Sequence, residues 1–64
     1  MTVTTLESLF NSVNVNLFVA RRDLDSAIEK GERDKNEPLV EALKALYARV
    51  DETLEEVAET RKFL

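Results

Sequence analysis

Hydrophobic residues recur every three or four positions along the first half of the chain. This spacing places them on one side of an α-helix, because 3.6 residues complete a turn. The pattern predicts a helix over about residues 4–30, with Thr4 as its N-cap and Glu7 completing a capping box. The apolar row has heptad spacing and comprises Leu6, Phe10, Val13, Leu17, Ala20, Leu24 and Ala27.

The second half of the chain carries a similar row with one local shift of phase, which predicts a helix over about residues 37–63. Arg61 is the one charged residue in this row, and we expect its stem to lie along Leu6 and its guanidinium to reach Glu7 or water. Tyr47 lies beside the row as a core residue with its hydroxyl at the edge. The row comprises Leu39, Leu43, Leu46, Val50, Leu54, Val57, Arg61 and Leu64.

The only glycine and the only proline lie between the two rows. Gly31 is suited to the left-handed conformation that ends many helices, and Pro38 is suited to the first turn of the next helix. Asn36 or Glu37 is then the N-cap of the second helix. A connector of about residues 31–36 between arms of similar length is typical of an antiparallel two-helix hairpin. The fold prediction is therefore a single all-α domain spanning residues 1–64.

A hairpin that turns near residues 33–34 brings the two apolar rows together. Small Ala20 then faces Leu46 and Tyr47, as interdigitated packing requires. The other expected layers are Ile28 with Leu39, Leu24 with Leu43, Leu17 with Val50, Val13 with Leu54, Phe10 with Val57, Leu6 with Arg61 and Val3 with Leu64.

Residues 13–19 permit a second interpretation, because apolar residues alternate there as they do in a β-strand. A strand followed by two helices resembles the ribbon-helix-helix DNA-binding dimers. The helical interpretation is favoured because the heptad row continues through this segment. The segment also lacks the outward basic residues that a DNA-reading ribbon needs.

Two helices lying side by side cannot enclose their apolar rows, so we expect the hairpin to dimerise into a four-helix bundle. The chain has no Cys and no His, which leaves oligomerisation as the usual way to stabilise so small a core. The predicted core and oligomer seam comprises Leu6, Phe10, Val13, Leu17, Ala20, Leu24, Leu39, Leu43, Leu46, Tyr47, Val50, Leu54 and Val57.

A second apolar group lies on the opposite side of the first predicted helix. It consists of Val15, Phe18 and Val19, bordered by Asn11 and Arg22. We interpret this group as a candidate surface for a protein partner or for higher assembly. Two alternatives remain open: a wider core that wraps both sides in the oligomer, and isolated surface hydrophobic residues, which are common.

Charge follows the same division into faces. The net charge of −4 argues against a general nucleic-acid or anionic-membrane surface. Basic and acidic residues alternate near the connector, where local ion pairing is expected. The second helix has an acidic outer face, interpreted as solvated, with docking of a basic protein or mimicry of nucleic acid as the alternatives. This face consists of Glu41, Glu52, Glu55, Glu56 and Glu59.

No arrangement of residues predicts catalysis, because nucleophile–base pairs, glycine-rich phosphate loops and the usual metal ligands are missing. We expect no cofactor, no metal, no small-molecule ligand and no membrane span, and a cytoplasmic location. The predicted function is that of a self-associating helical hairpin that binds or regulates a protein partner, as small phage and mobile-element accessory proteins do.

Two other functions remain open: a nucleic-acid regulator, built as an RNA-binding bundle or as a DNA-binding ribbon, and a structural assembly subunit. The length and hairpin plan resemble the repressor-of-primer proteins of plasmids, which are dimeric four-helix bundles that bind RNA loops. The resemblance is one of architecture, and no motif assigns RNA-contact residues to this chain.

Overall fold

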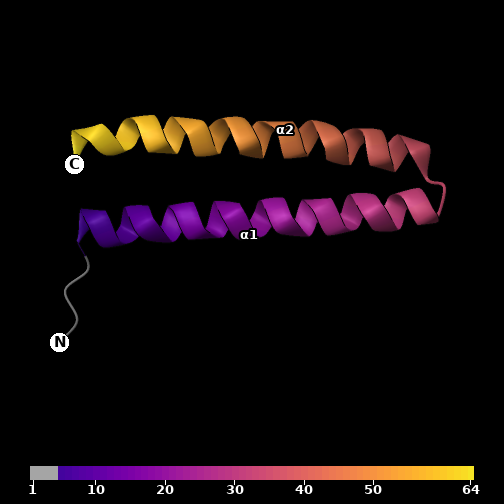
Figure 1. The fold of residues 1–64 in the computed structure, drawn as a ribbon, viewed down its shortest axis with the longest axis horizontal. Coiled ribbons are helices and arrows are strands. Elements are labelled where there is room, and N and C mark those ends of the chain that lie inside the picture. The colour runs from indigo at the N-terminus through magenta and orange to yellow at the C-terminus, as the bar shows by residue number, and fades with distance from the viewer. Residues whose placement is uncertain (1–4) are drawn as a thin grey trace.

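The computed structural model describes residues 5–64 and contains two antiparallel helices. Helix α1 spans Leu6–Arg33 and helix α2 spans Glu37–Thr60, followed by the short 3-10 turn η1 at Arg61–Phe63. The two helices lie side by side in one layer, and the start of α1 lies at the same end as the C-terminus (Figure 1). No strand occurs within residues 5–64, so the prediction of an all-α antiparallel hairpin is confirmed.

Helix α1 begins with a side-chain cap. The Oγ1 atom of Thr5 accepts a hydrogen bond from the backbone N–H of Ser8 at 3.0 Å. This bond satisfies one of the amide groups that the first turn of a helix leaves unpaired. Ser8 therefore occupies the third helical position that the sequence analysis gave to Glu7. The expected cap, Thr4, lies outside the described residues.

The segment over residues 13–19 is helical throughout. The alternative interpretation as a strand, and with it the ribbon-helix-helix architecture, is wrong. Asn and β-branched residues lower helix propensity by only a few tenths of a kcal/mol each. Packing of Leu17 against α2, together with the continuous helix on both sides, outweighs that preference.

Helix α1 ends one turn later than expected, because it continues through Gly31 to Arg33. The left-handed residue is Lys35, with φ 57°, and no described glycine has a positive φ. The N–H of Asn36 donates to the carbonyl of Gly31 at 3.0 Å, and the N–H of Lys35 donates to that of Glu32 at 3.1 Å. These two bonds form a Schellman motif, which closes the helix with a lysine where glycine is usual.

Gly31 has a packing role in place of the expected turn role. A Cβ atom at this position would lie 2.9 Å from Cγ2 of Val40, closer than side chains normally approach. Gly31 and Val40 are both buried at the loop end of the hairpin. The missing side chain therefore allows α2 to pack directly on the backbone of α1 just after the turn.

Helix α2 begins at the expected place. Asn36 is its N-cap residue, and the carbonyl of Asn36 accepts the hydrogen bond of the Val40 N–H at 3.0 Å. The Asn36 side chain forms no capping bond. Pro38 lies in the first turn, where its missing N–H leaves no hydrogen bond unsatisfied.

The expected pairing of the helices is wrong by about one helical turn. The structure pairs Arg21 with Asp51 and brings Val40 against Gly31. In the expected register, Leu17 would have faced Val50 and Ile28 would have faced Leu39. The cause is the end of α1: one more turn before the loop moves α2 by one turn along its partner. The same shift overturns the other predicted layers within the described residues.

Candidate interaction surfaces

The inner seam is the set of side chains that lie between the two helices. Its buried members are Ile28, Val40 and Leu54, each with 7–8% of its surface exposed. None of the described side chains is fully enclosed. A seam of this kind fixes the pairing of the helices but provides little apolar burial. The half-buried apolar members are Phe10, Leu17, Ala20, Leu24, Ala27, Leu43, Tyr47, Val50 and Val57.

Four residues of the predicted seam lie outside it. Leu6 is 75% exposed, and Val13, Leu39 and Leu46 are each close to half exposed. In α2, Val40 and Tyr47 take the inward positions expected for Leu39 and Leu46. Leu43, Val50, Leu54 and Val57 keep their predicted inward positions, so only part of the predicted row in α2 is exchanged. The expectation that these four residues pack between the two helices of one hairpin is wrong.

These displaced residues gather on one side of the hairpin, which we call the lateral face. Helical spacing places Leu9, Val13, Ala20 and Ala27 on this side of α1. Leu9 and Val13 are each about half exposed. On α2 the same side carries Leu39, Ala42, Leu46, Thr53 and Val57, and the exposed Leu64 follows the 3-10 turn η1. Both helices therefore present small and large apolar side chains to the same direction.

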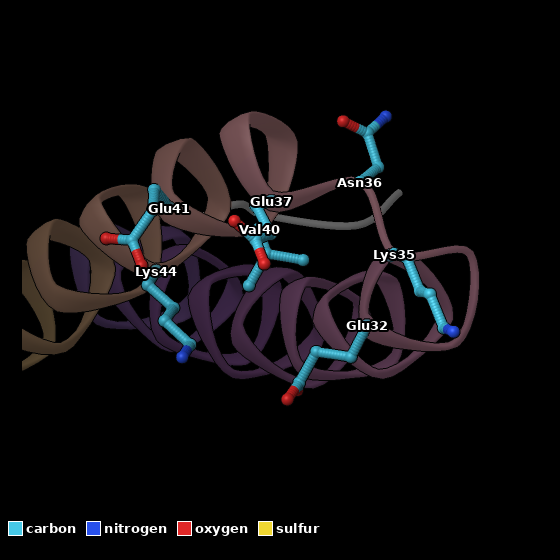
Figure 2. Close-up of a pocket in the computed structure, with 8 residues that line it drawn as sticks. Glu32, Lys35, Asn36, Glu37, Val40, Glu41 and Lys44 are labelled. Atoms are coloured by element: carbon cyan, nitrogen blue, oxygen red, sulfur yellow. The ribbon is translucent and has the colours of Figure 1, made fainter.

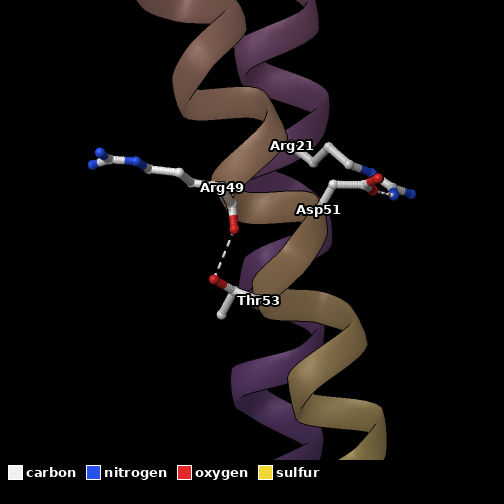
Figure 3. A network of polar contacts seen from close by, with 4 residues as sticks. All are labelled: Arg21, Arg49, Asp51 and Thr53. Atoms are coloured by element: carbon white, nitrogen blue, oxygen red, sulfur yellow. Dashed lines mark hydrogen bonds and ion pairs between the residues drawn. The ribbon is translucent and has the colours of Figure 1, made fainter.

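The opposite side of the hairpin holds a salt bridge between the helices. The guanidinium of Arg21 lies 2.6 Å from the carboxylate of Asp51 (Figure 3). Arg49 extends from the other side of α2, and Thr53 donates a hydrogen bond to the Arg49 carbonyl at 2.8 Å (Figure 3). Both partners of the salt bridge are partly exposed, so it contributes about 0.2–1 kcal/mol. Sequence reasoning missed the pair because it depends on the register.

Arg61 also links the helices, with a partner different from the expected one. Its guanidinium donates a hydrogen bond to the side-chain oxygen of Asn11 and lies 5.7 Å from the centre of the Phe10 ring. The expected contacts with Leu6 and Glu7 belong to the wrong register. Asn11, which was predicted to border a partner surface, is exposed and accepts this hydrogen bond from Arg61.

The predicted partner surface on α1 is present as a compact group, which we call the outer patch. Val15, Phe18 and Val19 are 58%, 48% and 39% exposed. Arg22 is exposed at the edge of the patch, and the guanidinium of Arg21 lies 5.0 Å from the centre of the Phe18 ring. A cation over an aromatic ring restrains the ring without covering its outer surface. The outer patch is therefore a second apolar surface, separate from the lateral face.

The acidic residues of α2 point to solvent. Glu41, Glu52, Glu55, Glu56 and Glu59 are all exposed. No group of three or more acidic side chains within residues 5–64 is arranged to hold a metal ion.

An open hollow of about 410 Å³ lies at the loop end. Figure 2 shows Val40 between the helices, while the side chains of Glu32, Lys35 and Asn36 point in different directions around it. The polar groups that line the hollow do not converge on one point, as ligand pockets usually require. Nearby, Lys30 and Asp34 form the local ion pair expected in this region, at 2.8 Å.

Neither α1 nor α2 combines the length and the hydrophobicity that a helix needs to cross a membrane. No protein-family model matches the chain, and comparisons with curated proteins and with solved structures gave no match.

Proposed function

We propose that this chain is a small, non-enzymatic interaction protein that works as a self-associated helical hairpin and binds a protein partner. The observation that carries the proposal is the presence of two separate exposed apolar surfaces on one small molecule. Contiguous apolar patches on soluble proteins mark interaction sites more often than chance allows. In this proposal the lateral face joins copies of the chain, and the outer patch contacts the partner.

The weakness of the inner seam supports self-association. Among the hydrophobic residues at positions 5–64 only Ile28, Val40 and Leu54 are buried, and the hairpin is one helix thick, with a shortest extent of 11 Å. Its radius of gyration of 15.2 Å exceeds the value of about 11 Å that a compact domain of this length has. A second layer of helices supplies the missing burial, as in four-helix bundles.

The composition of the outer patch supports a protein partner. Phe18 offers a large apolar surface that is already restrained by Arg21, so little side-chain entropy is lost when it is covered. Arg22 adds a positive charge at the edge, and aromatic residues and arginine are enriched at the centres of protein interfaces. The patch suits a partner with an apolar side chain flanked by an acidic group.

Replacement of Phe18 by Asp tests the role of the outer patch. The change places a charge where a partner must become dehydrated, so we expect at least a tenfold loss of the partner's retention on immobilised protein. Helicity and self-association should remain within about 10% of wild type, because Phe18 is half exposed. Affinity capture from the source cells, circular dichroism and sedimentation measure these three quantities.

Glu55→Gln provides the control, because it changes an exposed side chain on the acidic face of α2. It should retain the same partner as wild type. If the Phe18→Asp variant is unfolded, Phe18 belongs to a core, and the account of two separate surfaces is contradicted. Retention of nucleic acid that falls steeply with added salt would favour a nucleic-acid regulator, because phosphate contacts release counterions.

A further inference from the structure

We propose that two copies of the hairpin pack through their lateral faces in opposite directions, with the loop of each copy above the open end of the other. This inference rests on the proposed self-association and specifies its surface and its orientation. The lateral face is then covered by a second copy of this chain. A two-fold axis relates the two copies; it runs parallel to the layer that the two helices form and crosses the helix axes at a right angle.

The lateral face has the size that a dimer interface needs. Helix α1 has 28 residues and is therefore about 42 Å long. Two neighbouring helices present a width of about 20 Å, so the face covers roughly 800 Å². A standard protein interface buries about 800 Å² on each partner.

The charge distribution leaves this face free for close contact. The salt bridge of Arg21 and Asp51 lies on the opposite side of the hairpin. The nearest charged side chains, Asp23 and Arg49, stand at the outer edges of the lateral face by helical spacing. An apolar centre with charges at the rim is the usual composition of a protein interface.

The side chains of α1 are ordered by size around one central residue. Val13 and Ala27 are equally distant from Ala20 along the helix, on its two sides. Leu9 and Gly31 form the next pair outward. When α1 packs antiparallel on the α1 of a second copy, with Ala20 at the centre, Val13 of one copy lies opposite Ala27 of the other, and Leu9 lies opposite Gly31. Each larger residue is therefore opposite a smaller one. Such pairing keeps the separation of the two helices nearly constant.

Helix α2 has a similar arrangement around the point between Asp51 and Glu52. Leu46 and Val57 are equally distant from this point, and Leu39 and Leu64 are equally distant further out. Antiparallel packing of α2 on the α2 of a second copy therefore brings apolar residues against apolar residues on both sides of the centre.

The centre at Ala20 in α1 and the centre between Asp51 and Glu52 in α2 lie at the same level along the hairpin, although each follows from the sequence of one helix alone. Arg21 contacts Asp51, which places Ala20 of α1 at the level of the point between Asp51 and Glu52 in α2. A single two-fold axis that crosses both helices requires this coincidence. In the register expected from the sequence, the two centres would have differed by about one helical turn.

The parallel arrangement, with both loops at one end, packs α1 on the α2 of the second copy. It brings Leu6, Leu9 and Val13 against Leu64 and Val57 at the open end, and Gly31 and Ala27 against Leu39, Ala42 and Leu46 at the loop end. The facing side chains are then large on both helices at the open end but small on one helix at the loop end, so the separation of the helices would change along the bundle. The size order of the side chains therefore favours the antiparallel arrangement.

Distance measurements between spin labels test the orientation, and the cysteine-free chain permits labelling at single sites. A label at Glu32→Cys lies near the loop, on an exposed position of α1. Antiparallel packing separates the two labels in a dimer by roughly 36 Å along the helix axis, so a distance of about 40 Å is expected. Parallel packing would give about 25 Å or less.

Glu52→Cys is the second site, because it lies near the proposed axis and gives a short distance in the antiparallel arrangement, whereas parallel packing places the two α2 helices diagonally and gives a longer one. A distance of about 40 Å at residue 32 with a short distance at residue 52 supports the proposal. A distance of about 25 Å or less at residue 32 overturns the orientation and leaves self-association intact. If neither site gives a measurable distance between labels on two copies, and the mass is that of one chain, self-association itself is overturned.

A charge exchange at the rim gives a second test. Antiparallel packing brings Arg49 close to Glu56 of the second copy, whereas parallel packing brings it close to Asp23. Arg49→Glu should weaken the dimer about threefold to tenfold, and adding Glu56→Arg should restore it. Restoration by Asp23→Arg and failure of Glu56→Arg would establish the parallel arrangement instead.

Discussion

Lys35 holds the least favourable backbone conformation described in this chain, with φ 57°. A left-handed conformation costs a residue with a Cβ atom about 1–2 kcal/mol relative to glycine. The two hydrogen bonds of the Schellman motif hold Lys35 in place and close the loop after only three residues. The loop thus carries a local strain that the packing of the helices must offset.

Lys35→Gly should therefore raise the free energy of unfolding by about 0.5–1 kcal/mol. The gain is smaller than the full strain because glycine also makes the unfolded chain more flexible. Lys35→Ala is the matched control, since it removes the same side chain but keeps the Cβ atom, and it should give no gain. Denaturant unfolding followed by circular dichroism, at equal protein concentrations, measures the difference; equal stabilities for the two variants would contradict the strain.

Residue patterns predicted several features at this scale, including Pro38 in the first turn of α2, Asn36 as one of two candidates for its N-cap and the exposed acidic row of α2. They did not predict that Gly31 stays helical. Glycine at a helix end and glycine at a close contact between helices look alike in sequence. Only the position of Val40 distinguishes them, and that position depends on the fold.

The two helices approach each other closely at Gly31 and Val40, beside the loop. Sequence periodicity established the two helices and their antiparallel direction, because apolar spacing reports which residues share a face. It did not establish how far each helix slides along the other. A shift of one turn restores nearly the same apolar pairing, so the loop decides the register, and the loop was assigned one turn too early.

Gly31→Ala tests this contact between elements. Alanine favours a helix by about 1 kcal/mol over glycine, but its Cβ atom would meet Val40 and overpack the site by about 1–3 kcal/mol. We expect a net loss of about 1 kcal/mol in the wild-type background. In a Val40→Ala background the same substitution should become stabilising by up to about 1 kcal/mol. A double-mutant cycle measures this change of sign, and additive effects would show that the helices do not meet there.

At the scale of the whole molecule, the register divides the hydrophobic residues into three sets. One set fills the inner seam, a second forms the lateral face and the third forms the outer patch, while the half-buried Ala20, Ala27 and Val57 lie between the first two. The sequence indicated the outer patch and the need for a second layer of helices. It assigned Val13, Leu39 and Leu46 to the seam, because a heptad row does not reveal which half of it faces the partner helix.

The self-association of the chain through its lateral face is the central claim, and sedimentation equilibrium of wild type and Leu46→Glu tests it most directly. Leu46 is half exposed, so a charge there is tolerated by a single hairpin but not in an interface. We predict that wild type sediments at micromolar concentration with at least twice the 7.3 kDa mass of one chain. Leu46→Glu should shift the mass toward one chain. A folded wild-type monomer, or an unchanged assembly in the variant, would contradict the account.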